Sequence, residues 1–183
     1  MVAKQKSGLM TAEELMALPD DGNRYELEEG RLITMPPSGW KSSRLGVRFA
    51  VKLGGYIDAH GLGEYAGADG GIRLARNPDT VRAPDFTFVS NERVSDPGQG
   101  YYEGAPDLVV EVLSPSDRWA TLRRKATRYI EAGVRLVWLV DPERRRAEVY
   151  RADGTMDRLT ADGILDGEDV LPGYTLPLSK MWV

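Results

Sequence analysis

The sequence contains no cysteine and a single histidine, His60, among its 183 residues. Structural zinc sites are built mainly from cysteine and histidine, so this chain cannot form a Cys/His zinc site. A cysteine nucleophile is excluded, and a serine triad would have to use His60, which is a poor candidate because it sits beside a glycine in an expected helix-end loop. Any metal must therefore bind through oxygen, which favours Mg²⁺, Mn²⁺ or Ca²⁺. The absence of cysteine also suits a reducing cytoplasm, where we expect the protein to reside.

Long hydrophobic runs are absent as well. The longest strictly apolar run covers residues 136–140, whereas a membrane span needs about 20 apolar residues. The first nine residues carry lysines but no apolar stretch, so we expect neither a signal peptide nor a membrane segment. The chain has no repeats and no linker of biased composition. We therefore predict one domain over residues 1–183, with a flexible N-terminal segment at 1–10.

Acidic residues slightly outnumber basic ones, 28 against 24, which gives a formal charge of −4 and a pI near 5.2. This balance alone argues weakly against a nucleic-acid-binding protein. The charges are unevenly spread, however, because residues 41–52 and 118–128 hold nine basic residues and no acid. Two locally basic segments are therefore present in an acidic chain.

Hydrophobic periodicity predicts an α/β domain with a mixed sheet. Apolar residues at every fourth position indicate a helix over 40–59, and a second helix is expected over 118–132. A capping-box pattern predicts a short helix after Thr11. The unit over 108–140 reads as strand, helix and strand, which requires parallel pairing of its two strands. Strands are expected at 25–27, 32–35, 64–66, 72–75, 85–89, 108–113, 136–140, 147–151, 156–160 and 170–176.

Glu111 is the one acid in the apolar segment 108–113. An ionised carboxylate inside a buried strand costs several kcal/mol unless it is paired or bound to a metal. The plainer alternative is a strand end, where Glu111 would reach solvent or an arginine. Asp85 follows Pro84 at the start of another expected strand. Two such acids can share one Mg²⁺ while a backbone carbonyl, here that of Val112, supplies a further oxygen.

Lys125 is the basic residue expected to join these acids. The strand advances about 7 Å beyond Glu111, and the helix then rises about 12 Å between Asp117 and Lys125, so the two side chains can come level. A lysine there can hold a water and stabilise charge on a phosphate. The alternative is an ordinary exposed helix lysine. Glu26 is a candidate fourth member, although alternation along its strand allows it equally to face solvent.

Several segments, in their order along the chain, resemble the Uma-type putative restriction endonuclease family of bacteria, a branch of the PD-(D/E)XK nuclease superfamily. The resemblance runs from about residue 10 to the C-terminus. Each segment alone is weakly informative, whereas the ordered set is specific. The segments are RYELEEG at 24–30, RAPD at 82–85, PDLVVEVLSPS at 106–116, Lys125 with Tyr129, GV at 133–134 and VWLVDP at 137–142.

The resemblance implies a restriction-endonuclease-like fold and Mg²⁺-dependent hydrolysis of phosphodiester bonds, with Mn²⁺ as a substitute ion. It implies Asp85 and Glu111 as the paired acids and Glu26 as the family's extra N-terminal acid. Leu113 occupies the usual lysine position, so Lys125 resembles a lysine relocated to the following helix.

One residue must be rejected as a match to the family, and one feature of the family is missing. Asp107 also follows a proline, but it lies only four residues from Glu111 on the same expected strand, so we reject it as the paired acid. The family often has a histidine near the start of its first long helix, whereas residues 41–43 of this chain include none.

The two basic segments are candidates for contact with a DNA backbone. For either helix alone a solvated face is the favoured interpretation, whereas the two basic helices taken together make DNA contact equally favoured. The residues that we assign to DNA contact are Lys41, Arg44, Arg48, Lys52, Arg124 and Arg128.

The leading hypothesis is a metal-dependent endonuclease acting on double-stranded DNA, as a homodimer if both strands are cut together. The first alternative is a catalytically silent DNA-binding or interaction module that keeps the nuclease fold, favoured by the missing histidine and the acidic pI. The second is a metal-dependent hydrolase of a smaller phosphoester.

Overall fold

The computed structural model describes residues 8–96 and 98–182, and it confirms the predicted mixed α/β class. Its helices are α1 (Ala12–Met16), α2 (Trp40–His60), α3 (Trp119–Glu131) and the 3-10 helix η1 (Leu178–Lys180). Its strands are β1 (Arg24–Glu28), β2 (Arg31–Met35), β3 (Gly63–Gly67), β4 (Ile72–Ala75), β5 (Thr80–Arg82), β6 (Phe86–Ser90), β7 (Tyr102–Glu103), β8 (Leu108–Val112), β9 (Leu136–Asp141), β10 (Arg146–Arg151), β11 (Met156–Leu159), β12 (Ile164–Asp166) and β13 (Thr175–Pro177).

The larger sheet has six strands in the order β11-β10-β9-β8-β6-β3. β8 and β9 pair in parallel, whereas the other neighbours are antiparallel. This parallel pair, joined by α3, is the strand–helix–strand unit predicted over 108–140. Every residue of β8 is buried, as expected for a central strand covered on both faces.

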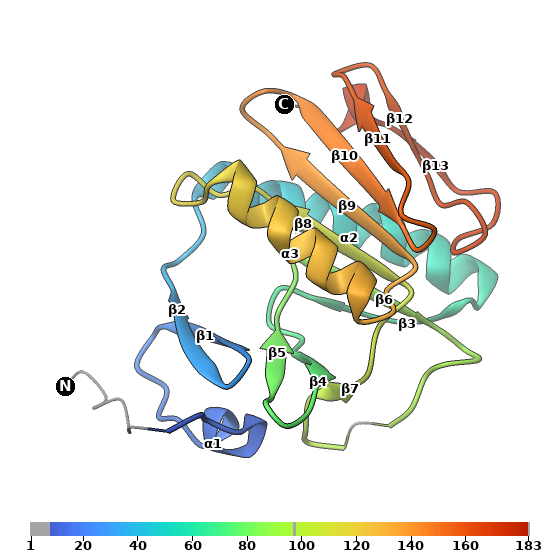
Figure 1. Ribbon diagram of the computed structural model, residues 1–183. Helices are drawn as coiled ribbons and strands as arrows, with labels where there is room; N and C mark the ends of the chain where they lie inside the picture. The colour runs from blue at the N-terminus through green and yellow to red at the C-terminus, as the bar shows by residue number, and fades with distance from the viewer. Residues whose placement is uncertain (1–7, 97, 183) are drawn as a thin grey trace.

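The two long helices cover opposite faces of the larger sheet (Figure 1). On one face, Phe49 of α2 packs in a core with Val110 of β8. On the other face, Ala126 of α3 packs in a second core with Val109. Side chains alternate along a strand, so Glu111 shares the α3 face with Val109. The strand register and the helix thus bring Glu111 under α3.

A five-stranded sheet lies beside the larger one, with the order β2-β1-β5-β4-β7 (Figure 1). α1 covers part of it, and Leu15 packs with Leu27 and Val81 in a small core. The chain passes from the smaller sheet to the larger one between β5 and β6. Residues 83–85 form this crossing, which places Asp85 where the two sheets meet.

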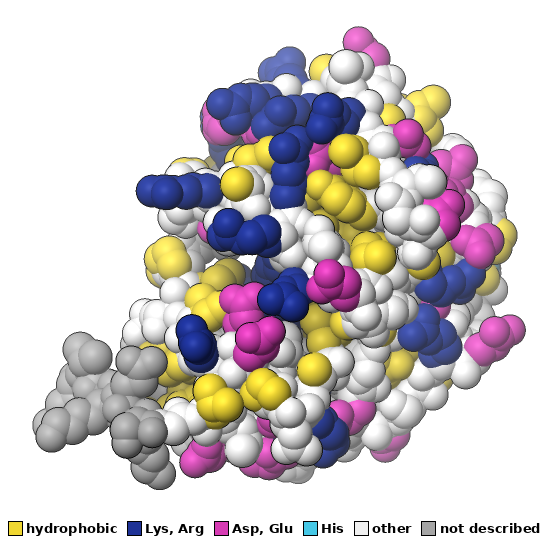
Figure 2. Space-filling model, viewed as in Figure 1, with side chains coloured by type: hydrophobic (Ala, Val, Ile, Leu, Met, Phe, Trp, Pro, Cys, Tyr) yellow, Lys and Arg dark blue, Asp and Glu magenta, His cyan; other side chains and the backbone are white. Residues whose placement is uncertain are grey.

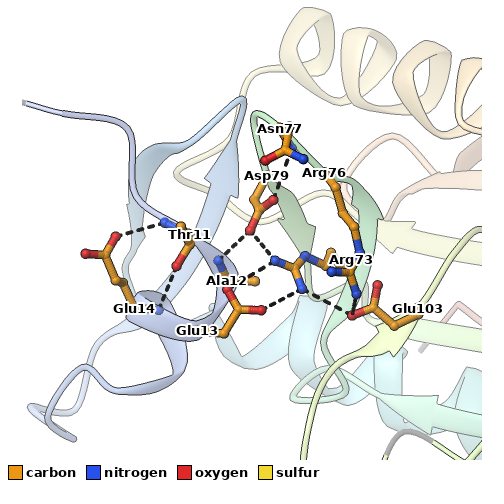
Figure 3. Close-up of polar contacts among 9 residues, drawn as sticks. All are labelled: Thr11, Ala12, Glu13, Glu14, Arg73, Arg76, Asn77, Asp79 and Glu103. Atoms are coloured by element: carbon orange, nitrogen blue, oxygen red, sulfur yellow. Dashed lines mark hydrogen bonds and ion pairs between the residues drawn. The ribbon is translucent and has the colours of Figure 1, made fainter.

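A buried ion pair fixes α1 to the β4–β5 hairpin (Figure 3). The Arg73 guanidinium contacts the Asp79 carboxylate, and both side chains are almost fully buried. Asp79 also accepts a hydrogen bond of 2.7 Å from the Ala12 amide, and Arg73 pairs with Glu13 at 2.8 Å and with Glu103 at 3.3 Å. The predicted capping box at Thr11 is present as well, because Thr11 and Glu14 exchange hydrogen bonds of 3.0 and 3.2 Å.

The structure differs from the sequence prediction mainly in short strands. β5, β7 and β12 were not predicted, because strands of two or three residues give no periodic signal. The strand predicted over 170–176 is wrong in its first half: Val170 lies in a turn, and only β13 forms, pairing with β12. Gly173, with φ of +82°, interrupts the extended backbone there.

The predicted flexible segment 1–10 lies mostly outside the described residues. Within it, Met10 is held in place, because its amide donates to the Gly30 carbonyl at 2.8 Å. In the described part of the chain, no helix is long and apolar enough to cross a membrane.

Candidate active site

Glu111 lies on β8, and Asp85 directly precedes the neighbouring strand β6 of the larger sheet. Phe86 of β6 is paired with Val110 of β8 in antiparallel register, which brings the residue before Phe86 level with the one after Val110. The Asp85 side chain continues this pairing, because its Oδ2 accepts a hydrogen bond of 2.7 Å from the Val112 amide. The paired acids predicted from the sequence are therefore adjacent.

Lys125 reaches these acids from α3. Its Nζ lies 2.7 Å from Oε1 of Glu111 and 2.9 Å from Oε1 of Glu26. The lysine side chain is only 12% exposed, so it is not an ordinary surface lysine. Tyr129, one helical turn further along, donates its hydroxyl to the same Glu111 oxygen at 2.7 Å. From the sequence, Tyr129 is expected on the apolar face of this helix and is part of the family resemblance, but no role in the site is predicted for it.

Glu26 lies in the smaller sheet and closes the site from the other side. It is 3% exposed, so it does not face solvent. Besides Lys125, it binds Arg82 at 3.0 Å and accepts a hydrogen bond of 3.1 Å from the Ala83 amide. Arg82 is also buried, and it was not among the predicted site residues. Its signal in the sequence is slight, because a single arginine near Pro84 does not indicate burial.

The pKa values of these groups are shifted in different directions and by different causes. Burial first, and then the nearby Glu111 carboxylate, raise the pKa of Asp85 to about 7. Burial also opposes ionisation of Glu26, but the charges of Lys125 and Arg82 lower its pKa overall. For Lys125, burial would lower the pKa, yet Glu111 and Glu26 raise it, so the ammonium stays protonated. Burial, and then Glu111, hold the pKa of Tyr129 well above its ordinary value.

A cleft of about 400 Å³ gives access to Asp85. Arg24 of β1 is the one basic residue that lines it in the described structure, and its side chain is 28% exposed. The Arg24 guanidinium contacts the Ala68 carbonyl and lies 3.6 Å from Asp69. On the opposite wall, Gly46 of α2 is so close that a Cβ there would lie 3.7 Å from the Asp85 side chain. The sequence prediction missed Arg24, because its place depends on contacts between the two sheets.

The donor set fits a hard divalent cation. Asp85 and Glu111 are carboxylates close enough for Glu111 to disfavour ionisation of Asp85, and a bound cation would offset this repulsion. Within the described residues, no cluster of three or more Asp, Glu, His or Cys could hold a metal by itself. Backbone or water oxygens would therefore have to complete the coordination.

The basic residues predicted on α2 do not line the cleft, because at about 3.6 residues per turn they fall on a different flank of the helix from its cleft-lining residues. Lys41 forms an ion pair with Glu143 at 2.9 Å, and Arg48 donates to the Met181 carbonyl at 3.2 Å. Together with Arg44 they line a separate cavity of about 230 Å³ next to the β9–β10 turn. Lys52 is exposed further along the helix. The α2 residues that line the cleft are Ser43, Gly46, Val47 and Ala50.

Arg124 and Arg128, the α3 residues assigned to DNA contact, are exposed on the outer surface of the helix, whereas Lys125 points inward. Lys and Arg side chains gather over this surface and over the β9–β10 turn (Figure 2). Arg124 is exposed and donates to Thr121 at 3.3 Å. Arg128 lies 3.5 Å from Glu29 and 3.7 Å from Glu131. Because α2 and α3 cover opposite faces of the larger sheet, the two predicted contact sets are separated by that sheet.

Asp107, the acid rejected from the sequence, lies outside this site. It is fully buried and pairs with Arg93 at 2.8 Å and Arg135 at 3.3 Å. It also accepts a hydrogen bond of 2.8 Å from the Ser90 amide. These contacts lie at the opposite end of β8 from Glu111, so Asp107 belongs to a separate group of ion pairs and not to the candidate site.

Comparison with known proteins identifies the family. The model of the Uma2 family, described as putative restriction endonuclease, matches residues 12–179. A putative nuclease belonging to DUF820 from Anabaena variabilis has a similar crystal structure, with a TM-score of 0.82, 18% identity and coverage of 94% of this chain and 97% of that one. No curated protein matches the chain. The structural likeness confirms the predicted nuclease-type fold, and the match to the family model, which spans most of the sequence, shows that the chain belongs to the Uma2 putative restriction endonuclease family.

Proposed function

We propose that this protein is a metal-dependent endonuclease that hydrolyses phosphodiester bonds in double-stranded DNA. The observation that carries the proposal is the convergence of Asp85, Glu111 and Lys125 at the junction of the two sheets, with Lys125 2.7 Å from Glu111. Membership of a family of putative restriction endonucleases supports it. Perturbed titratable groups in a cleft are typical of active sites.

Asp85 and Glu111 would hold Mg²⁺ or Mn²⁺, with the Val112 carbonyl as the predicted backbone ligand. When bound, the ion polarises the scissile phosphate and lowers the pKa of a coordinated water. Asp85 must be ionised to act as a ligand. Its raised pKa means that binding of the cation at neutral pH would be coupled to loss of a proton.

Lys125 would stabilise negative charge that develops on the phosphate during hydrolysis. Its pKa is raised, so it acts as a permanent cation and hydrogen-bond donor rather than as a general base. Glu26 and Glu111 hold its ammonium from two sides, and Arg82 in turn holds Glu26. Arg24, at the cleft, is the residue best placed to contact a substrate phosphate.

A plasmid-nicking assay with Mg²⁺, Mn²⁺ or EDTA tests this function. We expect cleavage with either ion, none in EDTA, and loss of cleavage by at least about 100-fold in Asp85→Ala and Glu111→Ala. Asp162→Ala, which alters an exposed acid near β12, serves as the control and should keep full activity. Unchanged cleavage in both site variants would refute the assignment.

The silent DNA-binding module is the second candidate, and one observation favours it. At the start of α2, where the family often has a histidine, Ser42 is buried and donates its hydroxyl to the Gly39 carbonyl at 2.9 Å. Salt-dependent DNA binding without cleavage under any metal condition would support this alternative. Hydrolysis of bis(p-nitrophenyl) phosphate but not of DNA would instead indicate a smaller phosphoester substrate.

A further inference from the structure

We propose that Tyr129 is a positioning residue that holds Glu111 in its metal-binding orientation. This inference rests on the proposed function, because it assigns Glu111 to a divalent cation. It concerns a residue that touches neither the cleft nor the predicted substrate, and it follows from the contacts of one carboxylate oxygen.

Tyr129 and Lys125 act on the same atom. They lie four residues apart on α3, so both side chains point from one face of the helix toward β8. The Tyr129 hydroxyl and the Lys125 ammonium each lie 2.7 Å from Oε1 of Glu111. A carboxylate with one oxygen bound to two fixed donors has little freedom to rotate. With Oε1 committed in this way, Oε2 is the atom that a metal ion would take.

The surroundings make the tyrosine a rigid support. Its side chain is fully buried, and it packs with Ala126, Val109 and Leu139 in the core beneath α3. The Tyr129 hydroxyl therefore cannot replace its hydrogen bond to Glu111 with one to water unless that core is disturbed. Residues that orient metal ligands in this manner commonly change metal affinity or activity by about 10- to 100-fold when mutated. Lys125 alone would not fix Glu111 equally well, because the ammonium is shared with Glu26.

The same face of the sheet offers a matched control. Glu148 of β10 is also buried, and it accepts a hydrogen bond of 2.8 Å from Tyr150. It lies in line with Glu111, because Leu139 of β9 is paired with both of them. Tyr150→Phe thus removes the same kind of bond from a buried glutamate two strands away from the site.

The test compares Tyr129→Phe and Tyr150→Phe in the full chain by titration calorimetry with Mn²⁺ and by plasmid nicking. We expect Tyr129→Phe to weaken Mn²⁺ binding about 10- to 100-fold and to lower kcat, with KM for DNA unchanged. Tyr150→Phe should match the wild type in all three. Phenylalanine keeps the packed ring, and thermal unfolding of the metal-free variants verifies that each remains folded.

Three results would overturn the inference. Wild-type Mn²⁺ affinity in Tyr129→Phe would show that the hydroxyl does not position Glu111. An equal loss in both phenylalanine variants would indicate general loosening of this face of the sheet. If the wild type itself bound no Mn²⁺, the proposed function would fail and this inference with it, which distinguishes the two failures.

Discussion

At the scale of single residues, the site is a row of charges whose balance depends on burial. Asp85 and Glu111 repel each other, whereas Lys125 lies between Glu111 and Glu26 and draws them together. The Lys125 ammonium partly compensates the negative charges of Glu111 and Glu26. For Asp85, burial and the Glu111 carboxylate outweigh the Val112 amide and the charges of Lys125 and Arg24, so its pKa is raised. Ionisation of Asp85 is therefore disfavoured in the metal-free protein, at the position where the proposed function places a cation.

The first prediction is that Asp85→Asn makes the metal-free protein more stable while abolishing cleavage. The folded-state pKa of about 7 lies above the ordinary value of 3.8, so ionisation of Asp85 opposes folding. This cost is absent below pH 3.8, grows as the pH rises and is complete above pH 7. Asparagine retains an acceptor for the Val112 amide without the charge. The shift corresponds to roughly 4 kcal/mol at alkaline pH, and we expect a gain of about half of this, because the buried asparagine amide also loses contact with water.

Urea unfolding in EDTA at pH 8 and pH 5 measures this effect. The advantage of Asp85→Asn over the wild type should be clearly larger at pH 8 than at pH 5. Asp162→Asn is the control, because that acid is exposed. A variant less stable than the wild type at pH 8 would contradict the electrostatic account of Asp85.

At the scale of elements, the sequence predicts those helices and strands whose hydrophobic residues repeat with a regular period. The stripe on α2 and the apolar runs of β8 and β9 are visible in the sequence because each repeats a pattern over several residues. The place of Lys125 followed from the rise of the helix after the strand. Arg24 and Arg82 could not be found in this way. Their roles arise where the smaller sheet meets the larger one, and no pattern within a segment encodes that contact.

The second prediction concerns how α1 is attached to the smaller sheet. Arg73→Met should destabilise the protein by about 3 kcal/mol, because it leaves Asp79 buried without its charged partner. Burial opposes ionisation of Asp79, yet the Ala12 amide and Arg73 lower its pKa in the folded protein. Stability from this pair is therefore present above the ordinary pKa of 3.8 and is lost as the pH falls through the lowered value.

Arg76→Met provides the matched control, since Arg76 also pairs with Glu103 but is 59% exposed. We expect that variant to change stability by less than about 1 kcal/mol. Chemical unfolding at pH 7 measures both variants. Equal effects would mean that the buried pair contributes no more than a surface contact.

At the scale of the whole molecule, the position of the cleft determines which basic surface would contact DNA under the proposed function. The cleft is lined by α2, and the basic residues Lys41 and Lys52 lie on this same helix. Arg124 and Arg128 lie on α3, across the larger sheet. A duplex bound at the cleft would therefore reach the basic flank of α2 without crossing the larger sheet, whereas α3 lies on the other face. The net acidity of the chain does not prevent this, because the basic residues are grouped.

The third prediction is that DNA affinity depends on the α2 surface more than on α3. Lys41→Gln with Lys52→Gln should weaken binding of a short duplex and reduce the slope of log K against log salt by up to about 2, since each phosphate contact contributes close to −0.9. The matched double variant Arg124→Gln with Arg128→Gln removes the same charge from α3 and should leave the slope almost unchanged. Fluorescence anisotropy across a salt series measures both. The cleft that gives access to Asp85 is lined by α2. If the α3 double variant weakened DNA binding more than the α2 double variant, DNA would approach across the opposite face of the sheet and could not reach Asp85 through this cleft.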